Sequence, residues 1–322
     1  MQVIRDRSKI LLPTLRVNRA VARVVRENSI STVAFGAAAP LAWMSGALRR
    51  AGVSRIVALT HGHEVWWSRV FPFSLAMRRI GKTTDALTYL GEFTRAAISR
   101  ALSSKNAQAM RKIAPGIDVE HFKPVDSTIL RNSLGLSDKK VIVSVGRLVH
   151  RKGQDFLINS MPAILRKVPN AHLLLVGQGP YLTHLEKLVA RDHVQENVSF
   201  IGRIQYNDLP AYICVGDIFV MPSRSRFAGL EVEGLGIVYL EASACGLPVI
   251  AGDSGGAPDA VLEGVTGFVV SGTDIEQISK QTVALLENPE LSRKMGQAGR
   301  EWIVKEWRWQ IWAEEFNSLL YP

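Results

Sequence analysis

The sequence lacks the features of membrane-spanning and exported proteins. No run of about eighteen apolar residues occurs, the shortest stretch expected to cross a bilayer as a helix. The apolar stretch after the opening residues is interrupted by Pro13 and Arg16, so it does not have the pattern of a signal peptide. Cysteine is scarce, since Cys214 and Cys245 are the only two, and both stand in apolar surroundings. We expect them to be buried thiols in a reducing cytoplasm.

Two large classes of ligand-binding protein are disfavoured because their motifs are missing. No helix-turn-helix, zinc-finger or aromatic-basic ribonucleoprotein motif is present, which argues against nucleic acid as a partner. A Rossmann dehydrogenase needs the pattern Gly-x-Gly-x-x-Gly after its first strand. The stretch from Val176 to Tyr181 lacks the third glycine and has Pro180 directly after the second. We therefore expect neither class.

What the sequence does have is a strong charge asymmetry. Residues 1–125 carry 20 Lys and Arg against 7 Asp and Glu, a net of +13, whereas residues 126–322 carry 19 against 22, a net of −3. With 322 residues, 47% of them hydrophobic, the chain is long enough to form two domains with large cores. The basic half indicates an anionic partner, either nucleic acid or anionic lipid. The missing nucleic-acid motifs make nucleic acid the weaker of these two candidates.

The second half alternates short apolar runs with stretches of helical spacing. Because the apolar runs have no polar alternation, they indicate parallel strands covered on both faces. Residues 126–300 are therefore predicted to form a doubly wound α/β domain. The predicted strands are Lys140–Val145, Ala171–Val176, Val198–Ile201, Ile218–Met221 and Leu247–Ala251, and the predicted helices are Gln154–Lys167, Tyr181–Asp192, Leu209–Val215 and one from about Gly236 to Gly246.

The first half repeats this pattern more loosely, and the chain ends in an aromatic helix. Strands are predicted at Ser31–Phe35, Arg55–Thr60 and Asp85–Tyr89, and the turn-rich stretch Pro115–Pro124 is predicted to link the domains. Residues Trp302–Leu320 are predicted to be one amphipathic helix carrying four tryptophans. It is either a membrane-interface belt or a packing helix, and the mixture of charge signs favours packing. The predicted parts are residues 1–120, 121–300 and 301–322.

The most informative stretch contains Glu233 and Glu241, separated by seven residues. A turn with Gly234 and Gly236 lies between them and leads into a helix, so Glu241 is expected more than one turn inside that helix. On an ordinary helix such a pair is simply solvated. Here a buried strand precedes the pair, and another strand and a glycine-rich loop follow it, which is typical of a nucleotide-binding unit. Two carboxylates beside a phosphate-attracting helix end suit a nucleotide sugar, one for the sugar and one for the ribose.

Basic residues follow the first strand of the same domain. Arg147 and Lys152 stand at a loop-to-helix junction, where their charges can neutralise a diphosphate. When a glycosyl–phosphate bond breaks, negative charge grows on the β-phosphate, and cations held there lower the barrier. The backbone of Arg203 and Ile204, at the end of a later strand, is positioned to meet a base.

Two histidines and a glutamate end a strand of the first half, at His61, His63 and Glu64. Such a cluster suggests a metal, but no further His, Cys, Asp or Glu cluster completes a zinc site. We therefore interpret the histidine as a contact to sugar or phosphate in a cleft between the domains.

Taken together, these residues resemble the GT-B glycosyltransferases of family 4. The similarity rests on the Gly-Arg-Leu loop with Arg147 and Lys152, the Phe-x-Gly strand end, the Glu233/Glu241 pair and the Gly-Leu-Pro-Val-Ile helix exit. It covers residues from ~30 to the end. The strings Thr-His-Gly-His-Glu, Gly-Leu-Glu-Val-Glu-Gly-Leu-Gly-Ile-Val-Tyr-Leu-Glu and Gly-Asp-Ser-Gly-Gly-Ala-Pro resemble the actinobacterial phosphatidylinositol-mannoside mannosyltransferases that use GDP-mannose. The resemblance implies a GT-B fold, two Rossmann-like doubly wound domains facing a cleft.

The resemblance also implies the activity and the role of each site residue. The activity would be a retaining mannosyl transfer from GDP-mannose to an anionic phosphatidylinositol mannoside, needing no metal or other cofactor, at the inner face of the plasma membrane. Arginines of the basic half, Arg16, Arg19, Arg23, Arg26, Arg49 and Arg50, would rest on anionic lipid. The implied roles are Arg147 and Lys152 for the diphosphate, Glu241 for the ribose, Glu233 with the backbone of Gly234, Leu235 and Gly236 for mannose hydroxyls, Arg203 and Ile204 for the base, and His61 near the anomeric carbon.

The sequence departs from the family in one respect. Family members open with a strand, a glycine-rich loop, a helix and a second strand, whereas this chain begins inside what resembles a later helix. We therefore expect the first domain to be incomplete and transfer to be impaired while nucleotide binding persists. The alternatives are another family 4 hexosyltransferase acting on a different glycolipid, a non-catalytic nucleotide-sugar-binding remnant, and a GT-B epimerase, which lacks this paired-glutamate pattern.

Overall fold

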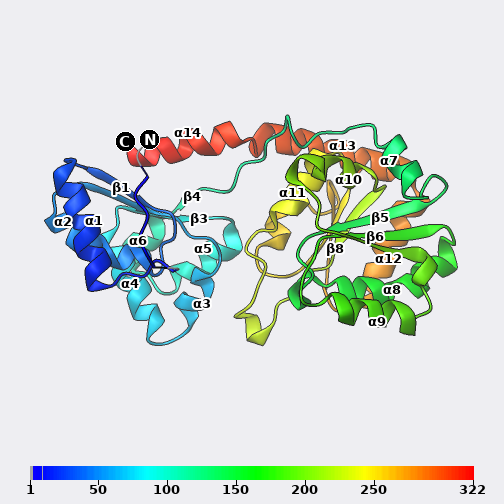
Figure 1. Ribbon diagram of the computed structural model, residues 1–322, viewed down its shortest axis with the longest axis horizontal. Coiled ribbons are helices and arrows are strands. Elements are labelled where there is room, and N and C mark those ends of the chain that lie inside the picture. Colours follow the sequence, from blue (N-terminus) through cyan, green and yellow to red (C-terminus); the bar gives the residue numbers. More distant parts are fainter. Residues whose placement is uncertain (1–2, 9) are drawn as a thin grey trace. The chain divides into compact units, whose positions relative to one another are not determined.

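The chain folds into two compact α/β units. The computed structural model describes residues 3–8 and 10–322. Unit 1 comprises Met1–Ala114 and Trp312–Pro322, and unit 2 comprises Pro115–Ile311 (Figure 1). Within the described residues, none of the helices combines the length and the apolar character needed to cross a membrane.

Unit 2 is built on a six-stranded, wholly parallel sheet. Its strands are β5 (Lys140–Val145), β6 (Ala171–Val176), β7 (Val198–Gly202), β8 (Ile218–Met221), β9 (Val249–Gly252) and β10 (Gly267–Val270). Their order is β10-β9-β8-β5-β6-β7, and every neighbouring pair is parallel. The order reverses between β5 and β8, which is the switch point of a doubly wound sheet. The prediction for residues 126–300 is confirmed, although β10 was not anticipated.

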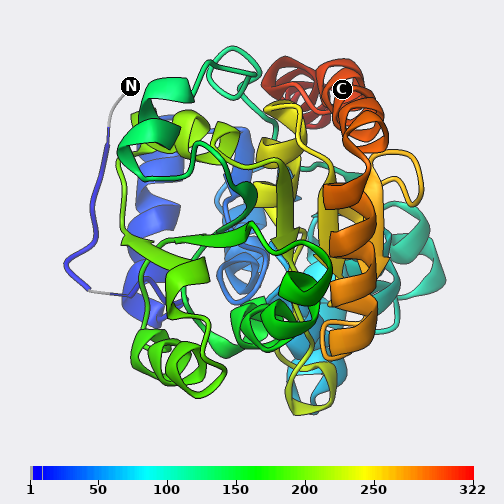
Figure 2. The same ribbon diagram turned by 90° about the vertical axis from the view of Figure 1, so that its right-hand side faces the viewer.

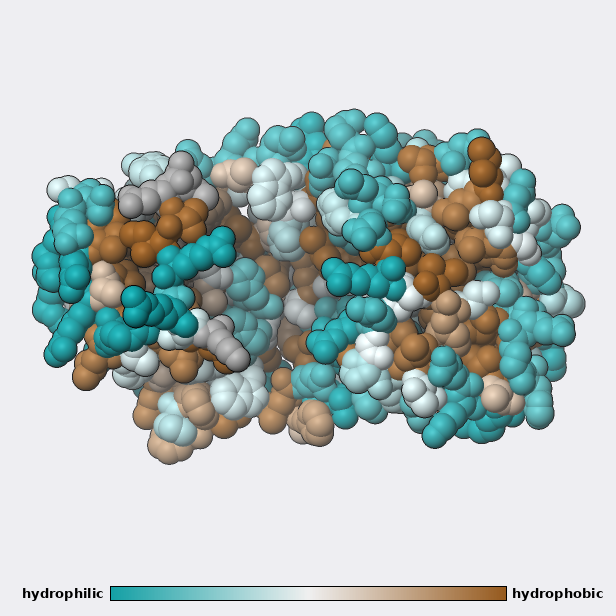
Figure 3. Space-filling view, in the orientation of Figure 1, coloured by the Kyte–Doolittle hydropathy of each residue, from teal (hydrophilic) through white to brown (hydrophobic). Residues whose placement is uncertain are grey.

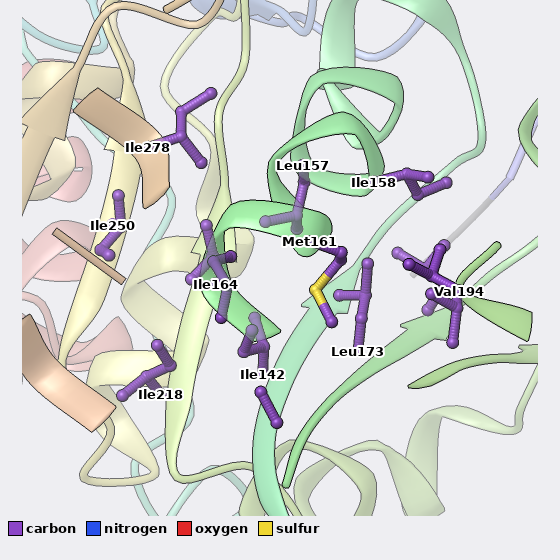
Figure 4. Packing of buried hydrophobic residues seen from close by; sticks show 14 of the residues in the cluster. Ile142, Leu157, Ile158, Met161, Ile164, Leu173, Val194, Ile218, Ile250 and Ile278 are labelled. Carbon is purple, nitrogen blue, oxygen red and sulfur yellow. The ribbon is translucent and has the colours of Figure 1, made fainter. Parts of the chain in front are cut away.

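Helices cover both faces of this sheet. They are α7 (Thr128–Ser133), α8 (Gln154–Lys167), α9 (Leu182–Arg191), α10 (Leu209–Cys214), α11 (Ile237–Ala244), α12 (Ile275–Glu287) and α13 (Pro289–Glu306). Helix α8 packs between α9 and α12, and α12, drawn in orange in Figure 2, runs beside the strands. Leu157, Met161 and Ile164 of α8 lie against Ile142 and Leu173 of the sheet, and all five are fully buried (Figure 4). This core holds the loops at the ends of the strands in place.

Unit 1 contains a smaller parallel sheet. The strands are β1 (Thr32–Phe35), β2 (Arg55–Ala58), β3 (Ala86–Tyr89) and β4 (Arg111–Lys112), in that spatial order. The three strands predicted for the first half are therefore confirmed. The helices are α1 (Leu15–Glu27), α2 (Ser45–Arg50), α3 (Glu64–Arg69), α4 (Phe73–Thr83), α5 (Glu92–Ser99) and α6 (Ser104–Gln108), together with most of α14 (Trp309–Leu320).

The prediction of one helix over Trp302–Leu320 is wrong, because α13 ends at Glu306 and α14 begins at Trp309. At the break, the carbonyl of Trp307 accepts a hydrogen bond from the N–H of Ile117 (2.7 Å), and the N–H of Trp309 donates to the carbonyl of Ile117 (3.2 Å). A side chain at Gly116 would lie 2.3 Å from the Cα of Trp309, so glycine permits this close approach. Pairing with a distant segment thus replaces the helical hydrogen bonds.

The tryptophans and cysteines mainly serve packing. Trp307 is only 2% exposed and makes an edge contact with Trp302, as the packing interpretation predicted, whereas Trp309 is exposed. Both cysteines are free thiols. Cys245 is buried, but Cys214 is only partly so, which corrects the expectation of two buried thiols.

Candidate functional site

Several of the residues predicted to bind a ligand follow β5 and β8, at the switch point of unit 2. The loop after β5 runs from Gly146 to a short helical turn that ends at Lys152, and α8 follows. Gly153, at the start of α8, has φ = 74°, and a side chain there would lie 1.8 Å from the carbonyl oxygen of Pro222, just after β8. Glycine therefore allows the two loops to approach closely at the point where open α/β sheets bind ligands.

Glu233 forms the centre of an ion cluster in these loops. Its Oε2 atom lies 2.7 Å from Nζ of Lys152 and 2.5 Å from a guanidinium nitrogen of Arg151. The side chains of Glu233 and Lys152 are each only 10% exposed. Burial lowers the pKa of the Lys152 ammonium, and the attraction of the Glu233 carboxylate opposes that shift. The structure thus brings together Lys152 and Glu233, which are far apart in sequence.

Glu241 lies on α11, which begins directly after Gly236, as predicted. Burial raises the pKa of Glu241 to about 7, against the opposing effect of the Lys152 charge. Burial raises the pKa of Tyr206, and the nearby charge of Glu241 raises it further. A half-buried carboxyl that titrates near neutrality, close to a buried cation, is typical of a functional site.

The turn that carries Glu233 is fixed through its backbone. The N–H of Glu233 donates to Oγ of Ser254 (3.1 Å), and its carbonyl accepts from the N–H of Gly256 (2.8 Å). At the other end of the turn, the buried hydroxyl of Tyr239 donates to the carbonyl of Met221 (2.8 Å). The backbone around Gly234, Leu235 and Gly236 is therefore held against the ends of β8 and β9, while the side chain of Glu233 reaches the cations.

Arg147 and Arg203 lie apart from this cluster but share one depression. Together with the glycine loop after β6, from Gly177 to Pro180, they line an open hollow of about 700 Å³. Both arginines are exposed, and Ile204 beside Arg203 is half-buried. Arg147 stands near the start of the loop after β5 and lines this hollow. Lys152 stands at the end of the same loop and pairs with Glu233.

The histidine motif of unit 1 is tied together by a buried carboxylate. Glu64, with no exposed surface, accepts a hydrogen bond from the N–H of His61 (2.9 Å) and lies 3.2 Å from Nε2 of His63. Nε2–H of His61 donates to the carbonyl of Gly36 (2.5 Å), so Nδ1 of a neutral His61 is left as an acceptor. Over residues 3–8 and 10–322, no group of three or more His, Cys, Asp or Glu has a metal-binding arrangement.

Two ion pairs near the site were not predicted from the sequence. Arg151 was visible only as a basic neighbour of Lys152, and its bond to Glu233 depends on the fold. Asp155 and Arg224 form a second buried pair, joined by two bonds of 2.6 and 2.7 Å, and Asp155 also accepts from the hydroxyl of Tyr181. In the sequence, Asp155 could be recognised only as an acidic residue in the first turn of a predicted helix.

Known proteins resemble both the site-bearing unit and the whole chain. The family model of group 1 glycosyl transferases matches residues 126–302. A GDP-mannose-dependent alpha-(1-6)-phosphatidylinositol monomannoside mannosyltransferase of Mycolicibacterium smegmatis is 44% identical over 99% of this chain and 84% of its own length. The enzyme of the same description from Mycobacterium tuberculosis H37Rv is 42% identical over 99% of this chain and 83% of its own length.

Solved structures agree in fold. HepE of Anabaena, crystallised with UDP, matches with a TM-score of 0.83 and 19% identity over 95% of this chain and 82% of HepE. Sucrose-phosphate synthase of Thermosynechococcus elongatus matches with a TM-score of 0.79 and 25% identity over 94% of this chain and 76% of the synthase. The predicted GT-B architecture of two parallel α/β domains is confirmed, while the expectation of an incomplete first domain stays a prediction. By the family match and by the relatives that span nearly its whole length, this chain belongs to the group 1 glycosyltransferases.

Proposed function

We propose that this protein transfers mannose from GDP-mannose to a phosphatidylinositol mannoside, with retention of anomeric configuration, at the inner face of the plasma membrane. The observation that carries the proposal is the 42–44% identity, over 99% of the chain, to enzymes named for this donor and acceptor. The cations after β5 and the carboxylates around α11 supply the chemistry that such a donor requires.

The donor would be held by unit 2. Arg147 and Lys152 bind the diphosphate, and their positive charge stabilises the negative charge that develops on the β-phosphate as the glycosyl bond breaks. Two cations can do this without a metal ion, so we propose that none is needed. The backbone of Arg203 and Ile204 contacts the base, and Glu241, as a carboxylate, accepts hydrogen bonds from the ribose hydroxyls.

The sugar would be held by Glu233 together with the turn from Gly234 to Gly236. A carboxylate is a strong acceptor for hydroxyl donors, and the bonds of the Glu233 backbone fix where this carboxylate can reach. We assign the remaining contact near the anomeric carbon to His61. Its Nε2–H is already engaged with Gly36, so its free Nδ1 would accept a hydrogen bond rather than donate one.

The acceptor side of the proposal rests on the basic surface of unit 1. Arg16, Arg19, Arg23 and Arg26 follow one another at intervals of three and four residues, which aligns them on one face of α1. Leu15, 76% exposed, and Ile10, 73% exposed, stand beside them in the sequence. Figure 3 shows strongly hydrophilic and apolar residues side by side over this part of unit 1. Such a mixture suits an anionic membrane surface, where each basic residue contributes about 1 kcal/mol.

The function is tested first by binding and then by turnover. Calorimetry should detect GDP but not UDP binding, and Glu241→Ala should abolish it. Purified protein should then transfer mannose from GDP-mannose to phosphatidylinositol monomannoside in the presence of EDTA, and NMR should report an α-linkage. Transfer from UDP-glucose, or to a different glycolipid only, would favour another hexosyltransferase of the family. Nucleotide binding without any transfer would favour the non-catalytic alternative.

A further inference from the structure

The ion cluster around Glu233 engages two cations at the proposed donor site. Arg151 and Lys152 both direct their donors to the same oxygen, Oε2 of Glu233. Within the described part of the chain, neither cation makes an ion pair with any other carboxylate. The carboxylate therefore occupies the position where these two cations would receive an anion.

The proposed function asks for a different set of partners. Lys152 has to bind the diphosphate, and Glu233 has to accept hydrogen bonds from the sugar. Both side chains are nearly buried, so neither ion can lose its partner to bulk water without a large cost. The backbone of Glu233 is fixed by Ser254 and Gly256, which leaves the side chain as the part that can turn.

We propose, on the basis of the proposed function, that Glu233 and the diphosphate compete for Arg151 and Lys152, and that this exchange selects a diphosphate carrying a sugar over a bare one. On binding, the phosphate oxygens displace the carboxylate from both cations. With a sugar nucleotide, the released carboxylate is satisfied by the sugar hydroxyls. With the bare nucleotide it is left buried beside another anion, which is unfavourable.

The exchange gives two residues a defined part in specificity. Arg151 becomes a third diphosphate-binding cation, beside Arg147 and Lys152, rather than a structural partner of Glu233. Glu233 weakens the binding of the product nucleotide relative to the donor, so its presence favours product release after transfer.

Glu233→Gln is the sharpest test, because the amide keeps the shape of the side chain but loses the charge that competes with phosphate. We expect this variant to bind GDP about tenfold more tightly than the wild type in calorimetry. Its preference for GDP-mannose over GDP should fall by at least tenfold. Glu231→Gln is the matched control, since Glu231 lies two residues away and, among the residues that the structure describes, its side chain forms an ion pair only with Arg226 (2.9 Å). This control should leave GDP affinity within about twofold.

Arg151→Met gives an independent measurement should Glu233→Gln fail to fold. If the exchange occurs, this variant binds GDP about tenfold more weakly, because a phosphate-binding cation is lost. Unchanged or tighter GDP binding by Arg151→Met would show that Arg151 serves only Glu233, and it would overturn the proposal. So would equal or weaker GDP binding by a folded Glu233→Gln protein. Failure of the wild type to bind GDP would instead contradict the proposed donor site.

Discussion

The two units use their charged residues in opposite ways. Unit 2 has 20 Lys and Arg against 22 Asp and Glu, and its partly buried cations are paired within the unit, as in Lys152 with Glu233 and Arg224 with Asp155. Unit 1 has 19 against 7. Over the residues that the structure describes, Arg19, Arg23 and Arg26 are exposed and form no ion pair with a carboxylate.

The difference in charge pairing indicates which kind of anionic partner suits each unit. In unit 2, Lys152 is nearly buried and paired with Glu233, so in the proposed exchange an incoming anion displaces a carboxylate already present. On α1 of unit 1, Arg19, Arg23 and Arg26 are exposed and have no carboxylate partner among the described residues, so an anionic surface can attract them without displacing one. The first arrangement suits a small ligand bound in one geometry, and the second suits an extended anionic surface.

The largest effect should follow removal of the buried cation of unit 2. We expect Lys152→Ala to lower kcat with GDP-mannose by about 10³-fold, because a charge that stabilises the leaving diphosphate is lost. Lys187→Ala, an exposed lysine on α9, is the control and should retain wild-type turnover. Steady-state kinetics of both variants measures the difference. Near-normal kcat in Lys152→Ala would mean that the cluster has a structural role only.

Breaking the second buried pair should affect stability most strongly. Asp155→Ala leaves the Arg224 guanidinium buried without its carboxylate, and we expect the free energy of unfolding to fall by about 3 kcal/mol. Urea denaturation measures this change. Arg19→Gln on unit 1 should change it by less than about 0.5 kcal/mol. Comparable losses in the two variants would erase the contrast between the units.

Neutralising the arginines of α1 should act on lipid binding. Replacing Arg19, Arg23 and Arg26 by Gln should weaken binding to phosphatidylglycerol vesicles about 100-fold, which corresponds to about 1 kcal/mol for each residue. Vesicle sedimentation at low salt is the measurement. The control removes the same charge from exposed positions of unit 2, through Lys187→Gln, Lys280→Gln and Lys294→Gln. Equal losses in both triple variants would show that only net charge matters.

The smallest effect concerns pH. Because burial raises the pKa of Glu241 to about 7, the folded protein holds this proton from about pH 4.5 up to 7, where the unfolded chain has lost it. Glu241 therefore stabilises the fold less as the pH rises through this window. Ribose binding requires the carboxylate, so GDP affinity should increase up to about tenfold between pH 6 and 8. The Glu241→Gln variant lacks this carboxyl, so only the ionisation of GDP itself remains. Calorimetry of this variant should show a GDP affinity that changes much less with pH.

Much of the fold was predictable because strands and helices leave local patterns. The apolar runs at Lys140–Val145 and Ala171–Val176 mark buried parallel strands, and both are found at those residues. The glycine turn before α11 and the position of Glu241 within that helix were also predictable from spacing. The break between α13 and α14 was not, because the competing hydrogen bonds come from Ile117, far away in the sequence.

By itself, the sequence determined the α/β class, the family, the charge asymmetry and which side chains are candidates for the donor site, since each depends on residue type and local spacing. The tertiary structure alone decided how those side chains pair. Glu233 and Arg151 stand 82 residues apart and meet only because β5 and β8 are neighbours in the sheet. The burial of Lys152 and Glu241 is decided in the same way, because desolvation depends on every segment packed around a charge and not on the residues next to it in the chain.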